Sequence, residues 1–164
     1  MTVCVGPERP DHPDAAALIG ELEALLAPEY PDESRHGLSV DQLLAQGVEL
    51  LVLRDDGVPA ACGGLLVVPD DEPPYGEVKR MYVRPAFRGR GHAKRILAQL
   101  EERAAVQGIA VLRLETGIHQ REAISLYERM GYRMRGRFGP YREDPLSRYL
   151  EKRLGAPEIS RTSG

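Results

Sequence analysis

The chain has 164 residues, 42% hydrophobic and 29% charged, a composition that favours one soluble globular domain. Its formal net charge of −3 counts against a nucleic-acid or anionic-membrane binder. The two cysteines, Cys4 and Cys62, have neither zinc-site spacing nor a disulfide framework, so we expect no metal and a reduced, cytoplasmic setting. No apolar run approaches the roughly 18 residues of a membrane span, and residues 1–10 show no secretion signal.

The first half of the chain predicts strands and helices in a definite order. Residues 3–6 are expected to form an edge strand. Leucines at helical spacing predict a helix over residues 15–26, capped by Asp11 or Asp14. Ser39 or Asp41 starts a shorter helix that Gly47 closes. Two apolar runs joined by a hairpin turn at residues 56–57 and a third run over residues 75–84 then predict three antiparallel strands.

The second half predicts a parallel crossover. A one-sided apolar stripe indicates a helix that begins near residue 91 and ends near residue 107. It joins strand 75–84 to a strand over residues 109–116, which is long enough for a right-handed parallel connection. A helix over 120–130 and strands over 132–138 and 147–154 follow. This order indicates one α/β domain over residues 1–154 with a mixed sheet, and we expect a disordered tail over residues 155–164.

The charge is distributed unevenly. Residues 79–95 hold seven lysines and arginines and no acid, while the rest, with 15 basic and 25 acidic residues, carries −10. This basic segment lies where Gly89 and Gly91 follow a strand and open a helix. Free backbone N–H groups and the helix dipole favour a phosphate at such a place. The alternative is a solvated helix face with glycines that only shape a turn.

Two common phosphate motifs do not fit this segment. The P-loop pattern GxxxxGK[ST] is absent. The dinucleotide fingerprint GxGxxG fails because Lys94 stands in place of its third glycine, and because the segment follows antiparallel strands.

The string Arg88-Gly89-Arg90-Gly91-His92-Ala93 resembles the acetyl-CoA pyrophosphate motif of the GNAT superfamily of N-acetyltransferases, Q/R-x-x-G-x-G/A. About 35 residues later, Leu-Tyr-Glu at 126–128 followed by Gly-Tyr at 131–132 is similar to the family's second signature. The resemblance covers roughly residues 48–153. It implies a mostly antiparallel central sheet of about six or seven strands, flanked by about four helices.

The resemblance also implies a binding site for acetyl-CoA. Backbone amides of residues 88–93 would hold the pyrophosphate. Met81 and Val83 would pair with the pantetheine arm, and the Met81 N–H would face the thioester carbonyl, where a donor stabilises developing negative charge. Gln120 stands where the family often has an asparagine that contacts CoA, and it offers the same amide on a longer stem.

Two side chains become candidate catalytic residues through the same resemblance. Tyr127 corresponds to a tyrosine near the CoA sulfur, where a phenol can protonate a departing thiolate; the alternative is an aromatic ring that packs the helix on the sheet. Glu77 stands where several members have a general base, which an amine of pKa near 10 needs before it can attack. Its alternative is a strand-end glutamate paired with a neighbouring lysine or arginine.

The acceptor is indicated less directly. The C-terminal part is rich in arginines, of which Arg135, Arg137 and Arg142 are candidates for a carboxylate on the acceptor; the alternative is an outward-facing strand surface. The sequence therefore predicts transfer of an acetyl group to a primary amine of a small molecule or peptide, by direct attack in a ternary complex. A non-catalytic acyl-CoA-binding or regulatory module and a nucleic-acid binder are the rivals, the latter disfavoured because tryptophan is absent and only 5% of the residues are aromatic. A homodimer stays open.

Overall fold

A computed structural model describes residues 2–155, so the expected tail lies outside the described residues from residue 156 onward. The elements follow the chain as β1 (Val3–Pro7), α1 (Pro13–Leu26), α2 (Val40–Gln46), β2 (Glu49–Asp55), β3 (Val58–Val68), β4 (Tyr75–Val83), α3 (His92–Val106), β5 (Val111–Gly117), α4 (Arg121–Arg129), β6 (Arg133–Arg135) and β7 (Ser147–Arg153). Short 3₁₀ turns occupy Asp32–Ser34 and Pro85–Phe87.

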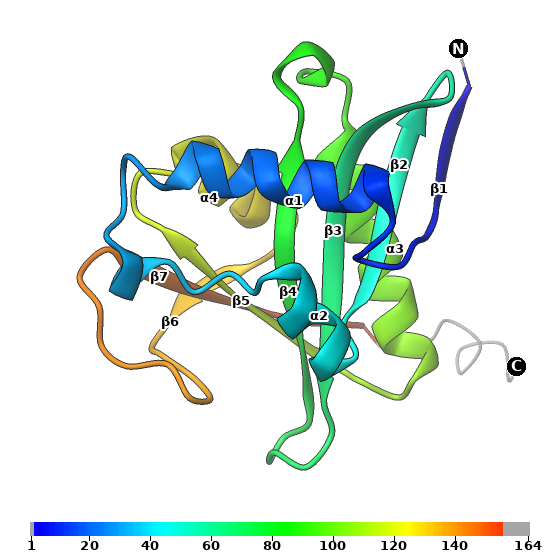
Figure 1. Ribbon diagram of the computed structural model, residues 1–164. Coiled ribbons are helices and arrows are strands. Elements are labelled where there is room, and N and C mark those ends of the chain that lie inside the picture. The colour runs from blue at the N-terminus through cyan, green and yellow to red at the C-terminus, as the bar shows by residue number, and fades with distance from the viewer. Residues whose placement is uncertain (1, 156–164) are drawn as a thin grey trace, which may run out of the picture.

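The strands form one seven-stranded sheet in the order β1-β2-β3-β4-β5-β7-β6 (Figure 1). Every neighbouring pair is antiparallel except β4 and β5, which α3 connects as a parallel crossover. The expected mixed, mostly antiparallel sheet with about four helices is confirmed, and β1 lies at the edge as predicted.

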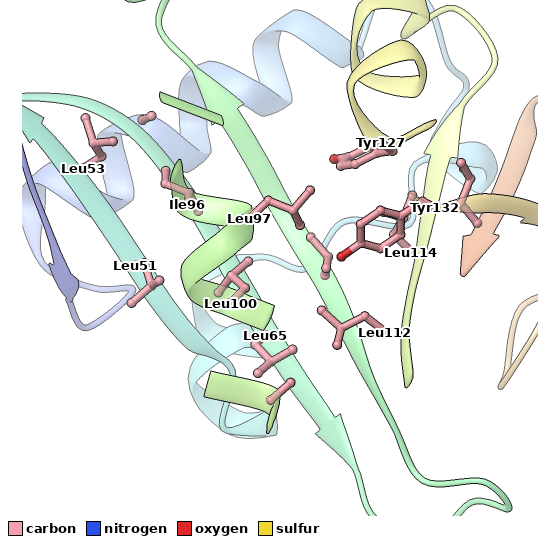
Figure 2. Close-up of a cluster of buried hydrophobic side chains, with 14 of the residues drawn as sticks. Leu51, Leu53, Leu65, Ile96, Leu97, Leu100, Leu112, Leu114, Tyr127 and Tyr132 are labelled. Atoms are coloured by element: carbon pink, nitrogen blue, oxygen red, sulfur yellow. The ribbon is translucent and has the colours of Figure 1, made fainter. Parts of the chain in front are cut away.

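Two hydrophobic clusters cover the two faces of the sheet. Strand β2 shows why: its residues are buried on both sides, since successive side chains point to opposite faces. Leu50 and Val52 join the cluster of α1 and α2, whereas Leu51 joins the cluster of α3 and α4. Figure 2 shows Leu97 and Leu100 of α3 within the cluster of α3 and α4. Each fully buried leucine contributes about 1.5–3 kcal/mol.

Local signals explain the helix ends, with one correction. Ser39 caps α2 through a capping box, and Gly47 ends it in the left-handed conformation at φ 70°. Helix α1, however, begins at Pro13 behind His12, whose Nδ1 accepts from the Asp14 N–H at 3.1 Å. The predicted caps Asp11 and Asp14 were therefore wrong. A proline is suited to the first helical position because its φ is preset and it has no N–H to satisfy there.

Strand β6 is shorter than predicted, with three residues in place of the expected 132–138. Tyr132 is buried against the α3–α4 side of the sheet, while Phe138 packs with Tyr75 and Tyr149 in a separate cluster. The chain thus leaves the sheet after Arg135, and Tyr132 and Phe138 on either side of β6 are buried in different clusters.

Strands β4 and β5 pair only over Gly76–Val78 and Leu112–Leu114, and Figure 1 shows them spreading apart beyond this point. Just past it, Arg80 and Met81 of β4 stand opposite the single residue Gly63 of β3. This is a β-bulge, and Arg80 adopts a positive φ of 56° that is uncommon outside glycine. The parting strands and the bulge open the sheet to a cavity.

Candidate active site

A cavity of about 130 Å³ lies at this opening. It is lined from β4, β5, α4, the end of α1 and the segment that follows α1. Four residues singled out from the sequence line it together: Glu77, Met81, Gln120 and Tyr127. The fold therefore brings the candidate acid, base and thioester-facing residue to one place.

Tyr127 lies on α4 and is 6% exposed. Its ring packs edge-on against Tyr132, with 5.9 Å between ring centroids, and belongs to the cluster on the α3 side (Figure 2). The predicted packing role is thus present. Tyr127 also lines the cavity, and its hydroxyl makes no hydrogen bond to residues 2–155. Burial raises the pKa of Tyr127, so the phenol stays protonated at neutral pH.

Glu77 is 4% exposed and already holds two partners. Its Oε2 accepts a short hydrogen bond from the Tyr141 hydroxyl and lies 3.1 Å from the Lys79 Nζ. Lys79 in turn donates to the Tyr141 hydroxyl at 3.0 Å. Burial and the nearby Glu77 charge raise the pKa of Tyr141. The pairing with a neighbouring lysine that the sequence left open as the alternative is therefore observed, within the cavity wall.

Glu115 is a second cavity carboxylate, which the sequence reasoning missed. It follows Leu112 and Leu114, which face α3, and alternation along β5 places it on the same sheet face as Glu77. Ser147 Oγ donates to its Oε2 at 2.7 Å, and its Oε1 has no hydrogen-bond partner among residues 2–155. Burial raises the pKa of Glu115. The signal available in the sequence was one acid near the end of an apolar strand.

The predicted phosphate loop has the backbone that such a loop needs. Gly89 and Gly91 have positive φ values of 79° and 78°, and Gly91 is the N-cap of α3. No side chain caps that helix, so its first N–H groups have no side-chain acceptor. A Cβ at either glycine would meet nothing within 4 Å, so there is room for a side chain at both positions. Glycine is favoured here because of the positive φ values.

The basic segment is less positive than its sequence implied. Four of its seven cations are ion-paired: Lys79 with Glu77, Arg80 with Glu23, Arg84 with Glu21 and Arg90 with Asp55. Among residues 2–155, the other three make no ion pair: Arg88, Lys94 and Arg95. These three lie in the loop and first turn of α3, so the uncompensated charge is concentrated at the predicted pyrophosphate site.

His92, the first residue of α3, has a buried side chain that contacts Asp55 of β2. Its side chain is 1% exposed, and its Nε2 lies 2.9 Å from Asp55 Oδ2, which also accepts from Arg90 Nη1 at 2.8 Å. These two partners hold the pKa of Asp55 below its usual range, the His92 hydrogen bond contributing most. The side chains of His92 and Arg90 therefore both contact Asp55. Only their backbone amides are left for the predicted contact with the cofactor.

The remaining predicted residues lie at different distances from the cavity. Gln120 lines it and accepts from the Tyr30 hydroxyl at 3.1 Å, and Val83 ends β4. Arg135 is ion-paired with Glu151 at 2.6 Å, and Arg137 donates to the Tyr141 carbonyl at 3.5 Å; neither lines the cavity. Arg142 lines a larger adjoining hollow of about 1310 Å³, which shares Glu77, Lys79 and Tyr141 with the cavity.

Comparison with known proteins identifies the class to which this fold and site belong. The family model described as the acetyltransferase (GNAT) family matches residues 19–132, so the chain belongs to this family. The expectation of an N-acetyltransferase is thereby confirmed at the level of the family.

Individual relatives agree with this assignment. The chain is 41% identical over 152 residues to a protein of Azospirillum brasilense named IAA acetyltransferase, covering 93% of this chain and 98% of that one. A crystal structure from Klebsiella pneumoniae, described as an acyl-CoA N-acyltransferase, matches at a TM-score of 0.77 and 34% identity, over 94% of this chain and 99% of that chain. A GNAT acetyltransferase from Elizabethkingia anophelis with acetyl-CoA bound shares the fold, with a TM-score of 0.67 and 20% identity over 93% and 98% of the two chains.

Residues 2–155 contain neither a helix suited to a membrane nor a cluster of metal-binding side chains. No described helix combines the length and the apolar character needed to cross a membrane. No group of three or more histidine, cysteine, aspartate or glutamate side chains within that range is arranged to hold a metal ion.

Proposed function

We propose that the protein transfers the acetyl group of acetyl-CoA to a primary amine by direct attack in a ternary complex. One observation carries the proposal. A single cavity joins the free hydroxyl of Tyr127, the bulge at Met81 and the carboxylates of Glu77 and Glu115.

The residues at the start of α3 fit the diphosphate of acetyl-CoA, which supplies the activated acyl group. The uncapped helix N-terminus, the two left-handed glycines and three unpaired cations together favour an anion. We assign the pyrophosphate to the backbone amides of residues 88–93, the pantetheine arm to Met81 and Val83, and a further contact to Gln120.

In the proposed reaction, the amine nitrogen attacks the thioester carbonyl carbon. One cavity carboxylate, Glu77 or Glu115, accepts the proton that the amine must lose. The Met81 N–H stabilises the negative charge that develops on the carbonyl oxygen. As the carbon–sulfur bond breaks, the Tyr127 hydroxyl protonates the departing thiolate, giving the amide and free CoA.

We propose a small-molecule or peptide amine as the acceptor, in a cytoplasmic setting without nucleic acid, membrane or metal. The adjoining hollow beside Arg142 shares Glu77 and Tyr141 with the cavity as lining residues, which supports an acceptor that extends into it. An acceptor carboxylate would find the Arg142 guanidinium there.

The test is release of free thiol from acetyl-CoA over a panel of amines, amino acids and peptides. Turnover with one acceptor class supports the proposal. Binding of acetyl-CoA without thiol release on any member favours the non-catalytic module. If Arg135, Arg137 or Arg142 binds a carboxylate, amidated acceptors react much more slowly than the free acids, and equal rates remove that assignment.

A further inference from the structure

The bulge in β4 contains an arginine whose surroundings the proposed reaction does not use. Arg80 is left-handed at φ 56°, and its side chain is 2% exposed. A left-handed conformation is unfavourable for a long side chain and persists only where the surroundings fix it. The surroundings of Arg80 must therefore hold it in this conformation.

Three contacts hold Arg80 in its left-handed conformation. Arg80 Nη2 donates to Glu23 Oε1 of α1 at 2.6 Å. The Cys62 thiol donates to the Arg80 carbonyl oxygen at 3.3 Å, and burial raises the pKa of this thiol to about 12, so it keeps its proton. The guanidinium also packs on Gly37, where an added Cβ would lie 1.7 Å from Arg80 Nη1.

Glu23 is the ion-pair partner of the Arg80 guanidinium. The Arg80 Nε is buried without any hydrogen-bond partner among residues 2–155, so Glu23 supplies the counter-charge and packing supplies the rest. A buried charge that loses its one partner is strongly destabilised in place and tends to move. Arg80 thus ties β4 to α1 and to the segment around Gly37, both of which line the cavity.

The opposite side of the bulge is also fixed. Met81 packs its side chain across Gly63, because a Cβ there would lie 2.3 Å from Met81 Sδ and 2.8 Å from Ile96 Cγ2. The Met81 side chain packs on the α3 side, and Met81 is one of the residues that line the cavity. The direction of the Met81 N–H is therefore governed by the conformation of the preceding residue, Arg80.

We infer that Arg80 is a positioning residue: locked by Glu23, it holds the bulge in the conformation that aims the Met81 N–H at the thioester carbonyl. This inference rests on the proposed function, in which that N–H is the donor. It assigns to the Arg80–Glu23 pair a role in catalysis without contact to the substrate.

The first test needs no acceptor. Acetyl-CoA labelled with ¹³C at the thioester carbonyl is bound to each variant, and the carbonyl stretch is recorded by isotope-edited infrared spectroscopy. Wild type should shift the band to lower frequency, as a hydrogen-bond donor does. Arg80→Gln and Arg80→Lys should lose the shift, since a lysine has no planar fork to bridge the same contacts. Arg84→Gln is the matched control, because it removes another β4-side ion pair to α1, at 2.8 Å, outside the bulge.

Two further variants keep the test valid if Arg80 substitutions fold poorly. Glu23→Gln leaves the arginine and removes its counter-charge. Gly37→Ala displaces the guanidinium without changing any charge. Both should reduce the band shift, and with an active acceptor both should lower kcat by about 10-fold or more while KM for acetyl-CoA stays within about twofold, as expected when a reacting group is misplaced.

The outcomes separate the inference from the proposed function. Wild-type protein that fails to bind acetyl-CoA overturns the proposed function. Wild type that binds acetyl-CoA without any shift removes the Met81 N–H as the donor, which overturns that step of the proposed function together with the inference. Folded Arg80, Glu23 and Gly37 variants that keep the full shift overturn the inference alone. A shift lost equally in Arg84→Gln shows a general loss of β4–α1 packing and also overturns it.

Discussion

At the scale of single residues, two neighbouring tyrosines of one core cluster differ in what their hydroxyl groups contact. The Tyr132 hydroxyl donates to Glu101 at 2.9 Å, whereas the Tyr127 hydroxyl has no partner among residues 2–155. Tyr127→Phe should therefore leave the melting temperature nearly unchanged and lower kcat by about 100-fold, the usual contribution of a general acid. Tyr132→Phe should keep the rate and lose about 1 kcal/mol of stability. Thiol release and thermal melts measure both; a Tyr127→Phe enzyme with wild-type kcat removes the acid role.

The two cavity carboxylates should respond in opposite directions to neutralisation. Burial raises the pKa of Glu115, and the titratable groups near it are His36, Lys79 and Glu77. When the pKa of a carboxyl is higher in the folded protein than in the unfolded chain, where it is about 4.3, the free energy of unfolding decreases as the pH rises from the unfolded-state pKa through the folded-state pKa. Glu115→Gln should thus raise the melting temperature at pH 7, and the gain should vanish near pH 4. Glu77→Gln should lower the melting temperature, because it leaves the buried Lys79 without its carboxylate.

Activity then decides which carboxylate is the base. The base is active only when deprotonated, so kcat/KM should fall on the acid side of its pKa. The variant that keeps the base should show the same fall in kcat/KM at low pH (the acid limb) as wild type. The variant that lacks the base should lose about 10-fold or more in rate and should not show that fall. If both single variants keep the wild-type limb, neither carboxylate is the base and water accepts the proton directly.

At the scale of elements, both ends of α3 are formed by glycines of the same conformation. Gly91 before the helix has φ 78° and Gly108 after it has φ 77°, and an added Cβ meets nothing within 4 Å at either position. Alanine at either place should cost the same strain, roughly 1–2 kcal/mol. Only Gly91→Ala should also weaken CoA binding, on the order of 10-fold, by blocking approach of the pyrophosphate to the backbone. Calorimetric titration with CoA measures this; an equal loss in Gly108→Ala assigns the effect to strain.

The elements that local sequence determines were predicted well. The Ser39 cap, the hairpin at Asp56-Gly57 and the glycine that ends α2 all depend on residues within a few positions of one another. The β-bulge could not be predicted this way, because it is a mismatch between β4 and β3, whose alignment depends on the whole sheet. The same limit hid Glu115, since only the observed pairing of β5 shows that it shares a face with Glu77.

The candidate site was predicted in part for the same reason. The resemblance to the GNAT motifs selected Tyr127, Met81 and Gln120. These residues line one cavity because the crossover from β4 to β5 through α3 fixes where their elements meet. Charge pairing was not predictable, since the acids of α1 that neutralise Arg80 and Arg84 lie 57 and 63 positions away. The catalytic roles of Tyr127 and Glu77 stay predictions.

At the scale of the whole molecule, the net charge of −3 and the basic segment are reconciled by where ion pairs form. Acids of α1 and β2 neutralise Arg80, Arg84 and Arg90, which leaves Arg88, Lys94 and Arg95 unpaired among the described residues at the start of α3. A positive region this small, on an acidic protein, suits one compact polyanion better than a nucleic-acid backbone.

This distribution predicts how binding depends on salt and on charge. Replacing Arg88, Lys94 and Arg95 together with glutamine should weaken CoA binding on the order of 10-fold at low ionic strength and flatten its salt dependence, because exposed charges are screened beyond about 10 Å at 0.1 M salt. Arg84→Gln removes one positive charge that is already paired and should leave the CoA affinity unchanged. Double-stranded DNA should give no mobility shift with wild type at 0.15 M salt. A shift that the triple variant abolishes would instead make this region a nucleic-acid site.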